Sequence, residues 1–407
     1  MRTSYKKEDV ILLLKDITGM VTPQTTKERE RLIQAGRHYC EMLPIEYVPT
    51  EKYIQVYEEA LELYAEPTAA AVGRLVDQIM MQRGENTVLV SLARAGIPIG
   101  ILVKRYLKWK YQIEVPHYSI SIIRGRGIDR NAMDYLLGRY EPQQLLFIDG
   151  WVGKGAILRE LEKDVAEYAG VSSKIAVLAD PANITDLCGT HEDLLIPSSC
   201  LNCTVSGLIS RTFLRSDIIG EKDFHGAVYY GELEQADLSY EFIEAVEQYF
   251  KQYDSRDLTD GMNDSRDLTD DMNDSRKTAH ETVVREGDHT DSRTQKGKAL
   301  HETDMEAYTD RQRQKGEAVQ GTGVEEVHKI ADAFGIEDLN FIKPGIGETT
   351  RVLLRRVPWK VLVHEAYQSD KSLRHILRLA EEKNVPIEYF PLQCYKCCGL
   401  IKKIADA

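Results

Sequence analysis

The sequence predicts a mostly parallel α/β sheet within residues 1–253 and a smaller α/β unit near the end of the chain. Three observations support this fold class. Short, nearly continuous apolar runs are typical of strands that are buried on both faces. Helical stretches alternate with these runs, which is the order that a parallel sheet needs. Clusters of glycine and charge follow the runs, at the strand ends where such sheets bind ligands.

The expected elements follow one another along the first part of the chain. Residues 27–63 are expected to be helical and broken at Pro44 and Pro49, because proline does not continue a helix. A further helix is expected to begin after Pro67. Strands and helices then alternate as strand 87–92, helix 99–109, strands 118–123 and 144–148, helix 156–169 and strand 174–179.

Length and composition indicate two folded units in a reducing compartment. The chain has 407 residues, 43% of them hydrophobic, which is enough for more than one core. Its net charge of −13 argues against indiscriminate binding to polyanions. Seven unevenly spaced cysteines do not form the disulfide framework of a secreted protein. With no signal-peptide pattern at MRTSYKKEDV and no apolar run that could span a bilayer, we expect a cytoplasmic protein without a membrane partner.

Charge and repetition divide the chain into three segments. Residues 254–320 carry 17 acidic and 11 basic residues and begin with two ten-residue repeats, DSRDLTDGMN and DSRDLTDDMN. A segment so poor in apolar residues cannot offset the entropy lost on ordering, so we expect a disordered linker. It would join a domain of residues 1–253 to a domain of residues 324–405, and the end of the chain, residues 341–407, is basic, with 12 basic and 7 acidic residues. No feature of the sequence indicates an oligomeric state.

Three loops at expected strand ends suit a phosphorylated ligand. The residues that we expect to contact it are Ser91, Arg94 and Gly96 in the first loop, Arg124, Arg126 and Asp129 in the second, and Asp149, Gly153, Lys154 and Gly155 in the third. Glycine lets backbone N–H groups approach an anion, and arginine and lysine add charged donors. Asp149 is placed to accept a hydrogen bond from a sugar hydroxyl, so the expected catalytic residues are Asp149, Lys154 and Arg126.

These motifs resemble two known families. FIDGWVGKGAI resembles the phosphoribosyl-diphosphate loop of type I phosphoribosyltransferases, and SLARAGIPIG resembles their pyrophosphate loop. VSLARAGIPIGILVKRYL, PHYSISIIRGRGIDRNAMDYLL and IPSSCLNCTVSGLISRTFL resemble more closely the bacterial cysteine protease StiP family, which is encoded beside tellurite-resistance and stress-response genes. The resemblance implies a phosphoribosyltransferase-like fold, a phosphorylated ribosyl substrate and Mg²⁺ as the usual metal. Gly150 and Val152 depart from the transferase pattern, which has a second acidic residue and a threonine there.

The name of the StiP family raises a second hypothesis, a thiol protease. Cys200 is its expected nucleophile and His191 or His225 its expected base, since a thiol nucleophile needs an adjacent imidazole. Phosphoribosyl transfer needs positioned phosphates and no thiol, and the loops rich in arginine, lysine and glycine favour it over proteolysis. Two CxxC pairs, at 200–203 and 394–397, have the local spacing of a zinc site, but their wide separation favours unliganded cysteines.

The basic end of the chain resembles a Pelota-type RNA-binding domain. The turn GIGE at the start of a helix with a basic face, NVPIEYFP and CYKCCGLIKK carry the resemblance, and we expect strands at 359–364 and 387–390 and helices at 371–383 and 395–405. The resemblance implies RNA contacts from Gly345, Gly347, Glu348, Arg351, Arg355 and Lys396. Relatives carry asparagine where this chain has Gly347. A non-catalytic, nucleotide-sensing RNA-binding module is therefore the third hypothesis.

Overall fold

The computed structural model describes residues 1–253 and 322–403. The expected linker with its repeats, residues 254–320, and the last residues of the expected C-terminal domain lie outside the described residues. By their contacts, the described parts of Met1–Arg256 and Gly321–Ala407 belong to one compact unit. The boundaries of the two domains within it stay a prediction.

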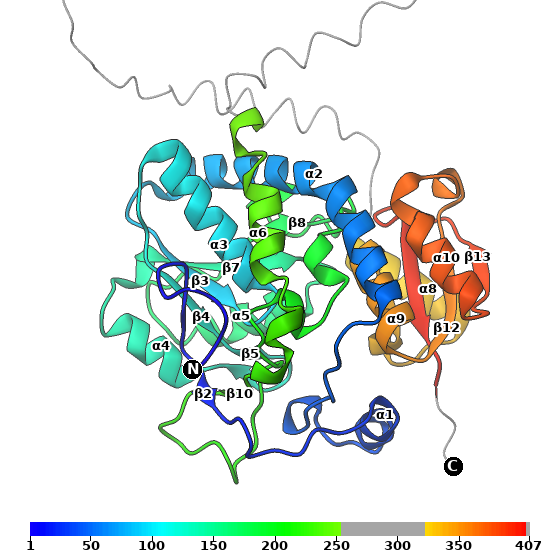
Figure 1. The fold of residues 1–407 in the computed structure, drawn as a ribbon, viewed down its shortest axis with the longest axis horizontal. Coiled ribbons are helices and arrows are strands. Elements are labelled where there is room, and N and C mark those ends of the chain that lie inside the picture. Colours follow the sequence, from blue (N-terminus) through cyan, green and yellow to red (C-terminus); the bar gives the residue numbers. More distant parts are fainter. Residues whose placement is uncertain (254–321, 404–407) are drawn as a thin grey trace, which may run out of the picture. The chain divides into compact units, whose positions relative to one another are not determined.

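A six-stranded sheet forms the centre of the N-terminal part (Figure 1). In spatial order its strands are β1 (Ile11–Leu12), β4 (His117–Ile120), β3 (Val88–Leu92), β7 (Leu145–Trp151), β8 (Ile175–Ala179) and β9 (Cys188–Thr190). Every neighbouring pair is parallel, which confirms the predicted α/β class. Strands β3 and β8 are buried along their whole length, as their continuous apolar runs indicate.

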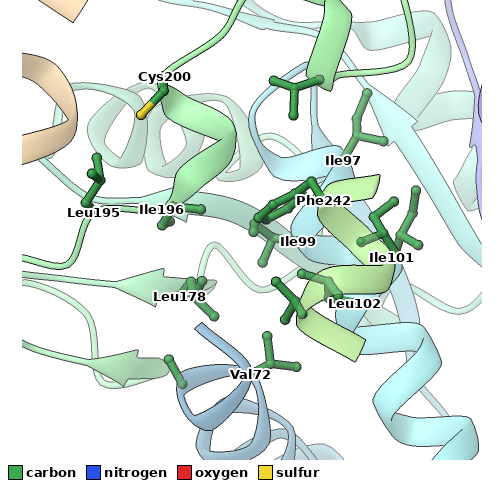
Figure 2. Packing of buried hydrophobic residues seen from close by; sticks show 14 of the residues in the cluster. Val72, Ile97, Ile99, Ile101, Leu102, Leu178, Leu195, Ile196, Cys200 and Phe242 are labelled. Atoms are coloured by element: carbon green, nitrogen blue, oxygen red, sulfur yellow. The ribbon is translucent and has the colours of Figure 1, made fainter. Parts of the chain in front are cut away.

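Helices cover both faces of this sheet. They are α2 (Glu51–Arg83), α3 (Gly96–Tyr106), α4 (Arg130–Leu137), α5 (Ala156–Val165) and α6 (Ser239–Glu247), whereas α1 (Thr26–Gln34) lies away from the sheet (Figure 1). Helices α2, α3 and α6 pack with Ile148 and Leu178 of the sheet in one hydrophobic cluster, part of which is shown in Figure 2. Helices α4 and α5 pack with Phe147 and Val177 on the other face. Neighbouring residues go to opposite clusters because side chains alternate along a strand.

Two details of the N-terminal part differ from the sequence-based expectation. Helix α2 runs through Pro67, where the sequence predicts a helix start. Its buried residues extend from Val56 to Ile79, and this packing outweighs the hydrogen bond that proline removes. The predicted strand 118–123 is split, because β5 (Ile122–Ile123) turns back and pairs antiparallel with β6 (Gly127–Ile128). A short parallel pair, β2 (Lys15–Asp16) with β10 (Gly226–Ala227), completes this part.

The C-terminal part has its own four-stranded sheet, in the order β11-β14-β12-β13. Its elements are α8 (Gly323–Phe334), β11 (Ile342–Pro344), α9 (Ile346–Arg355), β12 (Pro358–Val363), α10 (Arg374–Glu382), β13 (Ile387–Tyr389) and β14 (Cys397–Ile401). The helix predicted over 395–405 is wrong, since CCGLI forms the fully buried strand β14 between β11 and β12. Gly399 allows α9 to approach this strand, because a Cβ there would lie 3.1 Å from Cβ of Val352.

The two parts share one hydrophobic cluster. Leu353 and Leu354 of α9 belong to the same cluster as Cys200 and the residues of α2. The Tyr53 hydroxyl on α2 donates to the Leu354 carbonyl oxygen at 2.9 Å. Helix α9 therefore lies against the N-terminal part through apolar packing as well as polar contacts.

Candidate functional site

Two of the three residues that the sequence predicts to be catalytic lie in or just after β7, namely Asp149 within the strand and Lys154 in the turn that follows it. The Asp149 carboxylate accepts the Gly150 N–H at 2.7 Å, and burial raises the pKa of this carboxyl to about 6. The Lys154 ammonium donates to the carbonyl oxygens of Leu339 and, at 3.1 Å, Ile342. Burial, together with the charges of nearby basic residues, lowers the pKa of Lys154 to about 8. In this structure Lys154 contacts backbone of the C-terminal part, at the place where the sequence predicts a phosphate.

The other charged residues of the three predicted loops also have protein partners. Arg94 donates to the Ile209 carbonyl at 2.7 Å, Arg124 to Asn340 at 2.6 Å, and Arg126 to Glu41 at 3.0 Å. Asp129 caps α4 by accepting the Ala132 N–H at 3.0 Å. Ser91 bonds His117 at 2.6 Å in the interior. A phosphorylated ribosyl ligand, with or without Mg²⁺, stays a prediction for these loops.

In two of these loops, steric constraints explain why the residue is glycine. A Cβ on Gly96 would lie 2.4 Å from the Ile148 carbonyl oxygen, because α3 begins against the end of β7. Gly155 precedes α5 with φ of 70°, a backbone conformation that favours glycine. A Cβ on Gly153 would meet no atom within 4 Å, so packing does not require glycine there.

Cys200 lies in apolar surroundings. It follows the 3₁₀ turn Pro197–Ser199 and packs beside Leu195 and Ile196, as Figure 2 shows. Burial raises the pKa of its thiol to about 12, opposed by the charges of Arg355 and Arg351. No hydrogen bond among the described residues joins Cys200 to a histidine.

The two histidines predicted to serve Cys200 have other partners. His225 bonds the Ser121 hydroxyl at 2.8 Å, and His191 bonds the thiol of Cys188. The predicted grouping of Cys200 with either histidine is thus not the one that the structure contains. Spacing along the chain could not reveal this, because it does not show which side chains tertiary packing brings together.

A thiol, an imidazole and a carboxylate do meet at the edge of the sheet. Sγ of Cys188, the first residue of β9, lies 3.4 Å from Nε2 of His191, just beyond that strand. Nδ1 of His191 lies 3.0 Å from the Asp180 carbonyl oxygen and 3.8 Å from the Asp180 carboxylate. Donation from Nδ1–H to that carbonyl assigns the tautomer whose Nε2 lone pair faces Cys188. This is the relation that a thiol nucleophile and its base require.

The surroundings of this group set its protonation state. Burial, followed by the Asp180 charge, raises the pKa of the Cys188 thiol to about 12. Asp180 is itself buried and accepts the N–H groups of Ile184 and Thr185 at 2.7 and 2.8 Å, which fixes its carboxylate. The His191 side chain is 52% exposed. The thiol is therefore protonated at rest, and the imidazole lies between it and solvent.

The RNA-contact residues predicted at the chain's end lie at the start of α9 and along this helix as far as its last residue, Arg355. Gly345 precedes the helix with φ of 88°, which favours glycine, and Lys396 lies beside this turn. The Arg351 guanidinium bonds Glu348 at 3.1 Å, and burial lowers the pKa of Arg355 to about 10. The structure thus gathers these residues on one face. That face lies against the N-terminal part.

Comparison with known proteins identifies the family. Residues 3–247 match the family described as tellurite-like stress resistance cysteine protease StiP. A curated relative, "Cysteine protease StiP" of Acinetobacter baylyi, is 30% identical over 98% of this chain and 94% of its own length. The chain belongs to the StiP family. Residues 321–403 match the PELOTA RNA binding domain, so this StiP member also carries the predicted C-terminal domain.

Solved phosphoribosyltransferases match a smaller part of the StiP chain. A hypoxanthine-guanine phosphoribosyltransferase of Bacillus anthracis is 17% identical and covers 30% of this chain and 68% of its own, with a TM-score of 0.21. The xanthine-guanine-hypoxanthine enzyme of Helicobacter pylori is 19% identical and covers 33% and 77%, also with a TM-score of 0.21. At these scores the matches support no statement about ligand or chemistry.

Within residues 1–253 and 322–403, no group of three or more His, Cys, Asp or Glu side chains could hold a metal ion. No helix in the same ranges is long and apolar enough to cross a membrane.

Cys188 of this StiP chain was not predicted as a site residue from the sequence. Its signal is the short pattern Cys-Gly-Thr-His at 188–191, in which a histidine follows a cysteine by three residues at a strand end. The pattern alone is weak. It becomes specific only when β8 brings Asp180 beside it.

Proposed function

We propose that this StiP-family chain is a cysteine protease in which Cys188 is the nucleophile and His191 the general base. The observation that carries the proposal is the 3.4 Å approach of Nε2 to Sγ, with Nδ1 held by Asp180. The family description and the printed name of the curated relative support the same chemistry. The relative's name and the tellurite-like description also motivate a role in a stress response.

The residues can perform the reaction in two halves. His191 Nε2 takes the proton from Cys188 Sγ, and the thiolate attacks the carbonyl carbon of a peptide bond. The C–N bond then breaks, and the proton on His191 goes to the leaving amine. In the second half water loses a proton to His191 and attacks the thioester carbonyl, releasing a carboxylic acid and regenerating the thiol. The Asp180 carbonyl and carboxylate orient the imidazole and stabilise its charged form.

Phosphoribosyl transfer receives less support as the activity. Its predicted phosphate contact, Lys154, has backbone carbonyls as partners, and Arg94 donates to the Ile209 carbonyl.

We propose RNA binding as the second function, located in residues 322–403 and supported by the PELOTA match. Protease and RNA-binding domain would then lie on one chain, and the RNA would direct or regulate the protease.

Cleavage of dye-labelled casein tests the protease proposal. Wild type should release dye, Cys188→Ser should not, and Cys200→Ser should retain activity, because the Cys200 thiol lies among apolar residues. Loss of activity in Cys200→Ser with Cys188→Ser unchanged would transfer the nucleophile to Cys200. Circular dichroism of each variant shows whether it is folded.

A further inference from the structure

The start of α9, where the C-terminal domain would hold RNA, already has an anion from the same chain. Asp193 Oδ1 accepts the N–H of Ile346, the first residue of α9, at 2.9 Å. Its second oxygen accepts the Lys396 N–H at 3.0 Å. Backbone N–H groups at a helix N-terminus are a common site for phosphate, because they are unpaired and lie at the positive end of the helix dipole. Asp193 occupies the position that an RNA phosphate would take.

An aromatic ring lies on the same face of α9. The Arg351 guanidinium lies 4.4 Å from the centre of the Trp151 ring. RNA-binding proteins commonly stack arginine on unpaired bases, and an indole has the flat two-ring shape of a purine. Gly347 lies on the same face, since a Cβ there would be in van der Waals contact with the Trp151 ring at 3.8 Å and the Ser199 hydroxyl at 3.5 Å. Trp151 thus occupies the position of a stacked base.

We propose that Trp151 and Asp193 form an internal substitute for a base and a phosphate, so that RNA and the N-terminal part compete for the same face of α9. We call Trp151 and Asp193 the cradle. The ligand is RNA with an unpaired purine next to an accessible phosphate, as in a bulge or an internal loop. Binding such RNA requires the C-terminal domain to leave the cradle. This competition rests on the proposed RNA-binding function.

The cradle also connects RNA binding to the thiol group. Asp193 follows His191 by two residues, between β9 and the turn Pro197–Ser199. Nearby, the Gly323 N–H at the start of α8 donates to the Ala182 carbonyl at 3.1 Å, two residues after Asp180. The docked C-terminal domain therefore holds both segments that position the imidazole. Release by RNA removes these two contacts and frees the segments that hold His191 and Asp180 beside Cys188.

RNA affinity of cradle variants in the full-length chain tests the competition. The probe is a fluorescein-labelled RNA hairpin with a purine-rich internal loop, measured by fluorescence anisotropy. Trp151→Ala and Asp193→Ala should bind it about tenfold more tightly than wild type. In each variant part of the cradle is missing, so a larger fraction of the protein has α9 free to bind RNA. The near-isosteric Asp193→Asn should show a smaller increase. Asp217→Asn removes the ion pair with Arg215, away from α9, and should bind like wild type.

Arg351→Ala separates competition from simple loosening of the fold. It also removes the contact with Trp151, but it deletes an expected RNA contact, so it should weaken RNA binding while the cradle variants strengthen it. The same affinity in wild type, Trp151→Ala and both Asp193 variants would overturn the competition and leave RNA binding intact. RNA binding by none of the proteins would reject the RNA-binding function and the competition with it.

Alkylation of Cys188 tests the link to the thiol group independently of proteolysis. With saturating RNA, iodoacetamide should label Cys188 in wild type about tenfold faster, as a shift from docked to released protein predicts. Mass spectrometry of the peptides identifies the labelled cysteine. Unchanged labelling of Cys188 in protein that demonstrably binds the RNA would contradict the link.

Discussion

Cys188 and Cys200 are alike in burial and different in their neighbours. Burial raises the pKa of both thiols to about 12. His191 lies 3.4 Å from Sγ of Cys188, whereas Cys200 packs among Leu195, Ile196 and other apolar residues. A buried thiol is inert unless a base can remove its proton during the reaction. The comparison teaches that the imidazole, rather than the burial or the CxxC spacing, separates a candidate nucleophile from a core cysteine.

Removing the His191 imidazole should have the largest effect, because it removes the feature that distinguishes Cys188 from Cys200. His191→Ala should lower casein cleavage by about 10² to 10⁴-fold, the usual contribution of a general base. His225→Ala serves as the control, because His225 bonds Ser121 and neither thiol. An equal loss of casein cleavage in both variants would indicate damage to the fold. It would then give no reason to distinguish Cys188 from Cys200.

Replacing each thiol by a hydroxyl should affect stability unequally. Cys200→Ser places a hydroxyl among apolar residues and should lower the free energy of unfolding by about 1–3 kcal/mol. Cys188→Ser should cost less, because His191 can accept the new hydrogen bond. Urea unfolding followed by circular dichroism measures both. A larger loss for Cys188→Ser would contradict this account of their surroundings.

The pH dependence of the free energy of unfolding should be affected in the same way by both thiols, because burial raises the pKa of each. In the unfolded chain a thiol ionises near its ordinary value of 9.0, and in the folded chain near 12. Stability from each buried thiol is therefore fully present below pH 9 and is lost as pH rises toward 12. Between pH 8 and pH 10.5, wild type should lose more stability than either Cys200→Ala or Cys188→Ala. Equal losses in wild type and Cys200→Ala would show that Cys200 is not perturbed.

Apolar runs predicted the sheet because each run is long enough to be a strand and too short to be a buried helix. Continuous runs such as KIAVLA correspond to β8, which is buried on both faces. The same rule fails for CCGLI, since the charges that follow at 402–403 and the flanking CYK pattern also fit a helix. Only pairing with β11 and β12 decides for a strand there.

The candidate site was predictable only where it depends on local sequence. The positive φ of Gly345 is a local requirement that favours glycine, whereas the close approach of Gly96 to Ile148 depends on tertiary packing. The partners of Lys154 depend on contacts between distant segments, and the contact of His191 with Asp180 depends on the pairing of β8 with β9. The glycine and basic residues of the loop therefore predicted an anion site. In the structure, Lys154 donates to backbone carbonyl oxygens of a distant segment.

Labelling by an active-site-directed electrophile tests the central claim most directly. Full-length wild type and His191→Ala are treated with a peptidyl acyloxymethyl ketone, which alkylates activated thiols, and the adduct is located by mass spectrometry. The account predicts an adduct on Cys188 in wild type and little or none in His191→Ala. An adduct on Cys200 that persists in His191→Ala would contradict it.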